Sequence, residues 1–139
     1  MSVTTKEVQL KSRPDGMPKP GDFEIVVVEI SSPGDDQVLV ENIFMSVDPY
    51  MRGRMREDFQ LGTVMEGAAI GKVIESRNPK FLPGDYVTHW KGWREHYLSD
   101  GKDLSKVDPD LAPLSAYLGV LGFPGLTAYG GLLTTGALH

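Results

Sequence analysis

Hydrophobic positions along the chain fall into short runs separated by glycine- and proline-rich turns, a pattern that predicts strands more than long helices. Apolar and β-branched residues predict a strand over Val3–Leu10 and another over Phe23–Ile30. A third strand is predicted over Gln37–Met45. The tight turn Pro33-Gly34-Asp35-Asp36 lies between the second and third strands, so we expect these two to pair antiparallel.

The next third of the chain has the same character. Thr63–Glu75 reads as a long strand, and its glycines Gly67 and Gly71 predict a bulge or a strong bend. Tyr86–Trp90 and Trp93–Ser99 are separated by a short turn and are expected to form a hairpin.

After Val107 the pattern changes to weak helical spacing. Short helices are predicted over Leu111–Leu121 and Leu126–Leu133, with Gly136 as a C-cap of the second. A chain that passes through β-structure and then begins helices usually continues. We therefore expect the sequence to be interrupted after His139.

One stretch, Asn42–Arg54, combines an abrupt strand end with unusual side chains. Asp48-Pro49 must take the chain out of the sheet, because proline lacks a ladder donor and biases its predecessor away from helix. The residues that leave the sheet include Tyr50, with Arg52 and Arg54 close behind, and Arg52–Thr63 is expected to be a loop. Side chains at such a strand end can line a pocket. Alternatively, Tyr50 lies in a surface turn and covers the core.

Composition narrows the classes of function. The chain has 139 residues, a formal net charge of −5 and a pI near 5.1, which argues against a nucleic-acid surface. It has no cysteine, so disulfides, thiolate nucleophiles and Cys-ligated zinc are excluded. No apolar window has the length of a membrane span, and we expect a cytoplasmic protein.

Three motifs together resemble one protein family. They are S-V-D-P-Y-M-R-G-R-M at Ser46–Met55, F-L-P-G-D-Y-V at Phe81–Val87 and G-F-P-G-L-T-A-Y-G-G-L-L at Gly122–Leu133. In this order and spacing they resemble the N-terminal, GroES-like part of the zinc-independent medium-chain dehydrogenases/reductases. The most similar branch is that of leukotriene B4 12-hydroxydehydrogenase, prostaglandin reductase and the alkenal double-bond reductases. The resemblance covers Val8–Gly136.

The resemblance implies a mainly β fold, a GroES-like twisted β-barrel with a few short helices toward the C-terminus. Residues 1–121 would form the substrate and catalytic domain, and residues 122–139 would begin the connection into a Rossmann cofactor domain. No Rossmann glycine loop between a strand and a helix occurs in this sequence. The chain would then be part of a homodimeric, cytoplasmic enzyme and inactive alone.

The implied activity is NADPH-dependent reduction of the C=C bond of α,β-unsaturated ketones and aldehydes, with hydride to the β-carbon and a proton to the α-carbon. By resemblance Tyr50 would be catalytic and would line the substrate cleft, with Trp93 as an apolar wall. Thr127, through its hydroxyl, and Phe123, through packing, would lie near the nicotinamide. Structural alternatives are a helix cap for Thr127, a core position for Phe123 and hairpin packing for Trp93.

Two further possibilities are open. His89 and His96, on strands expected to face each other, make a metal site conceivable, but the family resembled here is zinc-independent and we expect no metal. The other possibility is a stand-alone GroES-like barrel that acts as a binding or interaction module.

Overall fold

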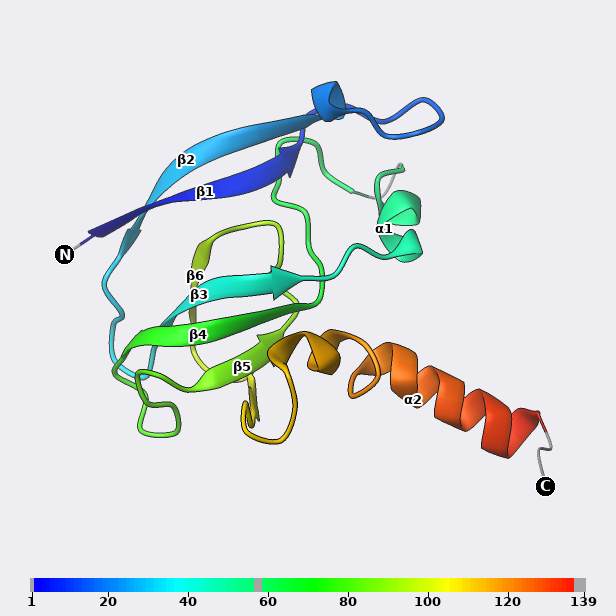
Figure 1. Cartoon of the computed structure of the whole chain (residues 1–139). Coiled ribbons are helices and arrows are strands. Elements are labelled where there is room, and N and C mark those ends of the chain that lie inside the picture. The colour runs from blue at the N-terminus through cyan, green and yellow to red at the C-terminus, as the bar shows by residue number, and fades with distance from the viewer. Residues whose placement is uncertain (1, 57–58, 137–139) are drawn as a thin grey trace.

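The computed structural model describes residues 2–56 and 59–136 and is mainly β (Figure 1). Its strands are β1 Ser2–Leu10, β2 Phe23–Ser31, β3 Val38–Met45, β4 Ala69–Ser76, β5 Tyr86–His89, β6 His96–Ser99 and β7 Ser105–Val107. Its helical segments are η1 Pro20–Asp22, α1 Pro49–Arg54, η2 Leu114–Leu118, α2 Phe123–Gly130 and η3 Gly131–Thr135. In this part of the chain no helix is long and apolar enough to cross a membrane.

β1 and β2 form a separate two-stranded antiparallel sheet, in register from Ser2 opposite Ser31 to Leu10 opposite Phe23. The expected pairing of β2 with β3 is therefore wrong. β3 is already bonded along both edges, to β4 on one side and to β6 on the other, so it has no free edge at Val38–Glu41 for β2. The turn at residues 33–36 carries the chain from one sheet into the other.

The second sheet has five strands in the order β6-β3-β4-β5-β7. The expected hairpin of β5 with β6 is also wrong, because β5 pairs with β4 and β7 while β6 pairs with β3. The segment between them is bonded to β3 instead. The Asn42 side-chain amide donates to the carbonyls of Lys91 and Arg94, at 2.9 and 2.8 Å.

The bend predicted at Gly71 is present as an irregular register between β3 and β4, which shifts between Asn42 and Phe44 and again between Leu39 and Val40. A Cβ on Gly71 would meet Val40 Cγ1 at 2.4 Å and the Glu41 carbonyl at 2.8 Å. Only glycine allows the two strands to approach so closely here. β4 begins at Ala69, so residues 63–68 are not part of the long strand that the sequence predicted.

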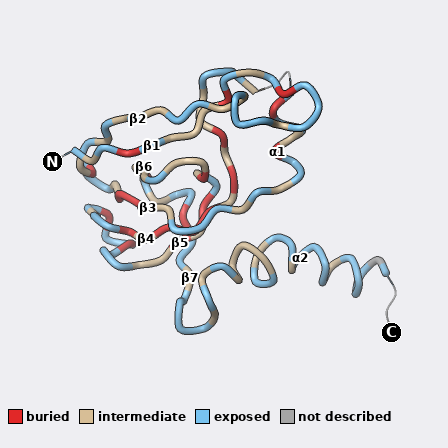
Figure 2. Tube along the Cα trace, turned by 45° about the horizontal axis from the view of Figure 1, so that its top comes forward, coloured by how far each residue is buried: buried red, intermediate tan, exposed pale blue. Residues whose placement is uncertain are grey.

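Two clusters of buried side chains hold the fold together. Figure 2 marks the buried residues in red along the chain. One lies within the five-stranded sheet and contains Val38, Val40, Val73, Phe81, Val87, Tyr97 and Leu104. The other joins β1 to α1 and contains Leu10, Met51, Met55 and Met65, with Phe23, Phe59 and Trp93 packed against it. Met51 is 2% exposed, so this second cluster anchors α1. The anchoring determines which side chains of α1 face away from the core.

The C-terminal segment is helical, as predicted, but it extends away from the sheets (Figures 1 and 2). Only Leu114–Leu118 of the first predicted helix forms, as a 3₁₀ turn. α2 continues into η3, which ends at Thr135 with Gly136 as its C-cap. α2 buries none of its residues. The predicted interruption after His139 lies outside the described residues.

Candidate functional site

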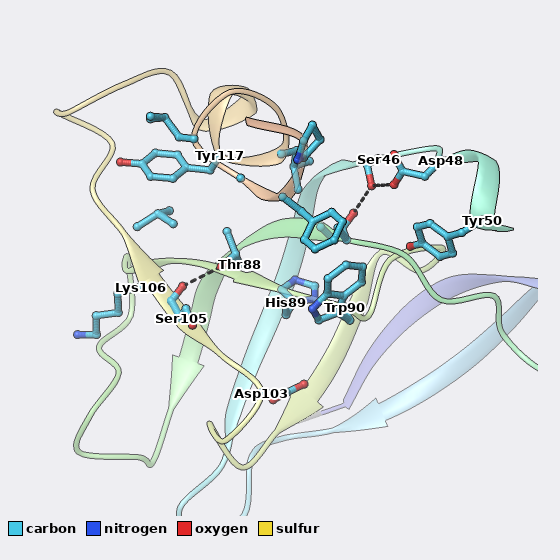
Figure 3. A pocket seen from close by; sticks show the side chains of 18 of the residues that line it. Ser46, Asp48, Tyr50, Thr88, His89, Trp90, Asp103, Ser105, Lys106 and Tyr117 are labelled. Carbon is cyan, nitrogen blue, oxygen red and sulfur yellow. Dashed lines mark hydrogen bonds between the residues drawn. The ribbon is translucent and has the colours of Figure 1, made fainter. Parts of the chain in front are cut away.

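A cleft of about 900 Å³ opens where the ends of β3, β4 and β5 meet α1, β7 and the first turn of α2 (Figure 3). Four aromatic side chains line it, from Tyr50, Trp90, Tyr117 and Phe123. Its polar lining includes Ser46, Asp48, Thr88, His89, Asp103 and Ser105. Apolar walls with a few polar groups are typical of small-molecule sites.

Tyr50 reaches the cleft because Asp48-Pro49 ends the strand and starts a helix. Pro49 begins α1 in the position that proline favours, so the loop predicted over Arg52–Thr63 is wrong at Arg52–Arg54, which belong to this helix. Ser46 Oγ donates to Asp48 Oδ2 at 2.6 Å, and the Ser46 amide donates to the Ala68 carbonyl at 2.9 Å. These bonds fix the start of α1, whose Met51 points into the core while Tyr50 lines the cleft.

The Tyr50 phenol is suited to donate a hydrogen bond. Partial burial raises its pKa above the usual value of 10.0, and the negative charge of Asp48 raises it further. The side chain is 40% exposed and its ring meets Trp90 edge-on, with centroids 6.4 Å apart. A neutral phenol at an aromatic wall can bind a carbonyl oxygen.

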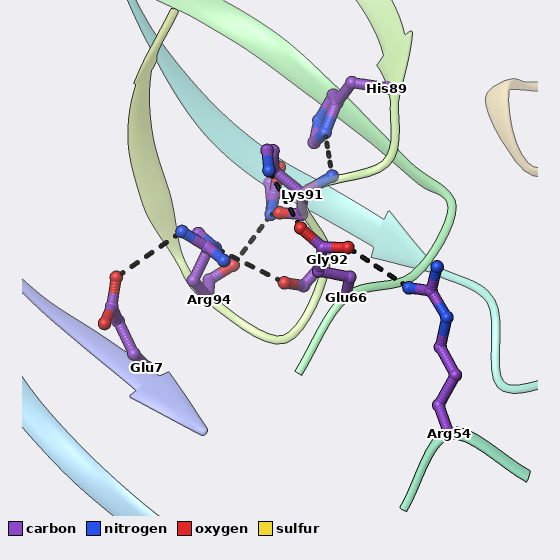
Figure 4. A network of polar contacts seen from close by, with 8 residues as sticks. Glu7, Arg54, Glu66, His89, Lys91, Gly92 and Arg94 are labelled. Carbon is purple, nitrogen blue, oxygen red and sulfur yellow. Dashed lines mark hydrogen bonds and ion pairs between the residues drawn. The ribbon is translucent and has the colours of Figure 1, made fainter. Parts of the chain in front are cut away.

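The two arginines near Tyr50 have protein partners. Arg54 Nη1 lies 3.1 Å from Glu66 Oε2, and Lys91 Nζ lies 2.9 Å from Glu66 Oε1 (Figure 4). The hydrogen bond from Lys91 lowers the pKa of Glu66, as does Arg54. Arg52 donates to the carbonyls of Pro14 and Gly16. These charges brace α1 against its neighbours.

His89 is a buried cleft residue that the sequence did not single out for the site. It is 4% exposed, and burial lowers its pKa from 6.5 to about 4, so the ring is neutral at pH 7. Its Nδ1 accepts a hydrogen bond from the Lys91 amide at 3.0 Å, which places the ring proton on Nε2. His89 Nε2 and the hydroxyl of neighbouring Tyr97 are buried without a protein partner.

His89 and His96 do not face each other, since β5 and β6 are not neighbours in the sheet. His96 Nδ1 lies 3.1 Å from Thr5 Oγ1. Within residues 2–56 and 59–136, no three His, Asp or Glu side chains are grouped to hold a metal ion.

The two residues expected near a nicotinamide lie at the start of α2. Phe123 lines the cleft and is 71% exposed, so its ring face is available to pack against a planar group. Thr127 does not line the cleft, and its Oγ1 donates to the Phe123 carbonyl at 2.9 Å. The oxygen can still accept a hydrogen bond. Phe123 therefore offers a ring face at the cleft, and Thr127 offers an acceptor oxygen further along α2.

Trp93, the expected apolar wall, does not line the cleft. Its ring stacks on Phe23 with centroids 5.7 Å apart and packs on the cluster around Met51. Its backbone has φ 59, a left-handed conformation that turns the chain here. Trp90, three residues earlier, occupies the cleft instead. Alternation along β5, where Val87 is buried and Thr88 is not, is the signal that could have pointed to Trp90.

Known proteins match this chain over most of its length. A family described as the N-terminal domain of oxidoreductase matches residues 6–107. The NADPH-dependent curcumin reductase of Escherichia coli is 41% identical over 133 residues, which are 91% of this chain and 39% of that protein. The NADP(+)-dependent 2-alkenal reductase of Nicotiana tabacum is 41% identical over 140 residues, 93% of this chain and 41% of that protein.

A solved structure agrees with these matches. The crystal structure of CurA from Vibrio vulnificus superimposes with a TM-score of 0.84 at 36% identity, covering 94% of this chain and 40% of that one. The chain thus spans about two-fifths of the length of these relatives. It belongs to the family of oxidoreductase N-terminal domains, in the medium-chain dehydrogenase/reductase branch that contains the curcumin and alkenal reductases.

Proposed function

We propose that this chain is the substrate-binding part of an NADPH-dependent reductase of α,β-unsaturated ketones and aldehydes. The observation that carries the proposal is the cleft, in which a neutral Tyr50 phenol stands among aromatic walls beside the exposed ring of Phe123. The names of the relatives, a curcumin reductase and a 2-alkenal reductase, support the same chemistry.

In the proposed reaction Tyr50 donates a hydrogen bond to the carbonyl oxygen of the enone. That bond strengthens as negative charge develops on the oxygen, so it favours the transition state over the ground state. NADPH, when bound, would supply the hydride that the β-carbon accepts, and the α-carbon would then take a proton from water. Phe123 would pack beside the nicotinamide, and Thr127 would offer its hydroxyl oxygen to it.

The division of the protein is part of the proposal. Residues 1–121 would form the substrate domain as a closed GroES-like barrel, and residues 122–139 would lead into a Rossmann cofactor domain. We propose that this chain is inactive without that domain. A cytoplasmic location and a homodimer are part of the same proposal and are supported by the family resemblance.

Replacing Tyr50 by phenylalanine tests the role of the phenol. In the reductase that contains this chain, Tyr50→Phe should lower kcat by roughly 100-fold, the usual effect of losing one donor to a developing oxyanion. KM should change little, because the aromatic wall is kept. Arg52→Lys, which keeps the charge but changes an α1 side chain that does not line the cleft, is the control. A wild-type kcat in Tyr50→Phe would refute the proposed role.

A further inference from the structure

The cleft has an aromatic wall that the family motifs do not include. Trp90 follows β5 directly and lines the cleft with 53% of its side chain exposed. Its ring meets the edge of Tyr50 at an interplanar angle of 63° (Figure 3). An indole left half exposed beside the proposed carbonyl-binding phenol has surface available to a ligand.

The backbone that carries Trp90 is held firmly on both sides. The Gly67 amide donates to the Trp90 carbonyl at 3.2 Å, and the Gly92 amide donates to the Gly67 carbonyl at 2.9 Å. The next amide, of Lys91, donates to His89 Nδ1 at 3.0 Å (Figure 4). A backbone held in this way fixes the direction in which the Trp90 side chain leaves the turn, so less conformational freedom is lost when a ligand packs on the ring.

His89 contributes to this arrangement through the backbone. Its buried ring accepts the Lys91 amide hydrogen bond and so holds the turn on which Trp90 sits. The Asn42 amide holds the same turn through the Lys91 carbonyl at 2.9 Å. His89 is a positioning residue in this view.

We propose that Trp90 determines substrate specificity by stacking with an aryl group conjugated to the enone, so that aryl enones bind more tightly than alkyl enones of equal size. The inference rests on the proposed function, since it assumes that the enone carbonyl lies at Tyr50. Aromatic rings prefer offset or edge-on contact with one another, which an alkyl chain cannot reproduce. Trp90 offers its indole next to the Tyr50 hydroxyl, on the same wall.

The test measures binding of two ligands to this chain by NMR, with the indole N–H signals as reporters. The ligands are benzalacetone, an aryl enone, and a straight-chain methyl enone with the same number of carbons. Trp93, stacked on Phe23 outside the cleft, is an internal control in the same molecule. The absence of cysteine removes thiol adducts from the titration.

We expect the Trp90 signal to shift on titration while the Trp93 signal stays, and benzalacetone to bind about threefold to tenfold more tightly. Trp90→Leu should remove this preference and leave alkyl-enone binding within about twofold. Trp90→Phe should restore most of it, which a purely structural role for Trp90 would not predict.

The failures can be told apart. If both ligands bind equally and Trp90→Leu changes neither affinity, the specificity proposal is wrong while the enone cleft stands. If neither ligand binds the wild-type chain, the enone cleft itself is wrong and the inference falls with it. If the Trp90→Leu chain loses its dispersed NMR spectrum, Trp90→Phe is tested alone. A folded Trp90→Phe chain that binds both ligands equally would then overturn the proposal.

Discussion

Tyr50 and Trp93 show how the local backbone determines whether an aromatic side chain lines the cleft or packs elsewhere. Both are large aromatics beside turns, yet only Tyr50 lines the cleft. Its helix is anchored by buried Met51, which leaves the adjacent position facing outward. Trp93 turns inward because the left-handed backbone at this residue directs the ring onto Phe23. The sequence indicates a tyrosine released by Asp48-Pro49, but it does not reveal which tryptophan shares its cleft.

Protonation of His89 should couple the stability of the fold to pH. The folded-state pKa of about 4 is below the ordinary 6.5, so the unfolded chain binds this proton first as the pH falls. The contribution of His89 is therefore present above pH 6.5 and is lost between pH 6.5 and about 4. The loss amounts to about 3 kcal/mol at 1.36 kcal/mol for each pH unit.

Urea unfolding across that pH range measures the effect. His89→Gln retains an acceptor for the Lys91 amide and cannot titrate, so its free energy of unfolding should fall less steeply on acidification than that of the wild type. Equal slopes for the two proteins would show that His89 is not the buried group responsible.

At the scale of elements, the positions of most strands could be predicted but their partners could not. β1, β2, β3, β5 and β6 lie close to the predicted segments, because β-branched runs and turn residues are local signals. Pairing depends on which strand edges remain free. β3 binds β4 and β6, and β5 binds β4 and β7, so neither predicted hairpin forms.

The close approach of β3 and β4 makes a sharp prediction for glycine. Gly71→Ala should lower the free energy of unfolding by about 1–3 kcal/mol, the usual cost of overpacking. The new Cβ would lie 2.4 Å from Val40 Cγ1 and 2.8 Å from a backbone oxygen that cannot easily move.

Gly53→Ala is the matched control for this substitution. Gly53 lies in α1 with no atom within 4 Å of the added Cβ, so alanine should stabilise the chain by up to about 1 kcal/mol through its helix propensity. Urea denaturation gives both values. If Gly71→Ala proves as stable as the wild type, the described packing of β3 on β4 is wrong.

At the scale of the whole molecule, the C-terminal helices expose the largest set of apolar side chains described. Phe123, Leu126, Tyr129, Leu132 and Leu133 are each more than half exposed. Surfaces of this kind are usually covered by another protein surface. Weak helical spacing in the sequence indicated the helices, but not that they would leave the body of the fold.

We expect the isolated chain to self-associate through this surface, with a sedimentation coefficient that rises with concentration. Leu126→Glu combined with Leu133→Glu should suppress the rise, since both residues are exposed on the helical segment. Leu111→Glu changes an equally apolar but non-helical exposed position, 74% exposed, and should leave association unchanged. Association that is insensitive to the double substitution would locate the contact elsewhere.

The central claim is that the cleft serves reduction of a conjugated C=C bond. The most direct test is to incubate the full-length protein, in which we propose that this chain continues into a cofactor domain, with NADPH and benzalacetone. The product is then identified by mass spectrometry and NMR. The saturated ketone, formed by the wild type and strongly reduced in Tyr50→Phe, is the predicted result. An allylic alcohol, which requires hydride transfer to the carbonyl carbon, or no turnover with any enone or enal, would contradict the account.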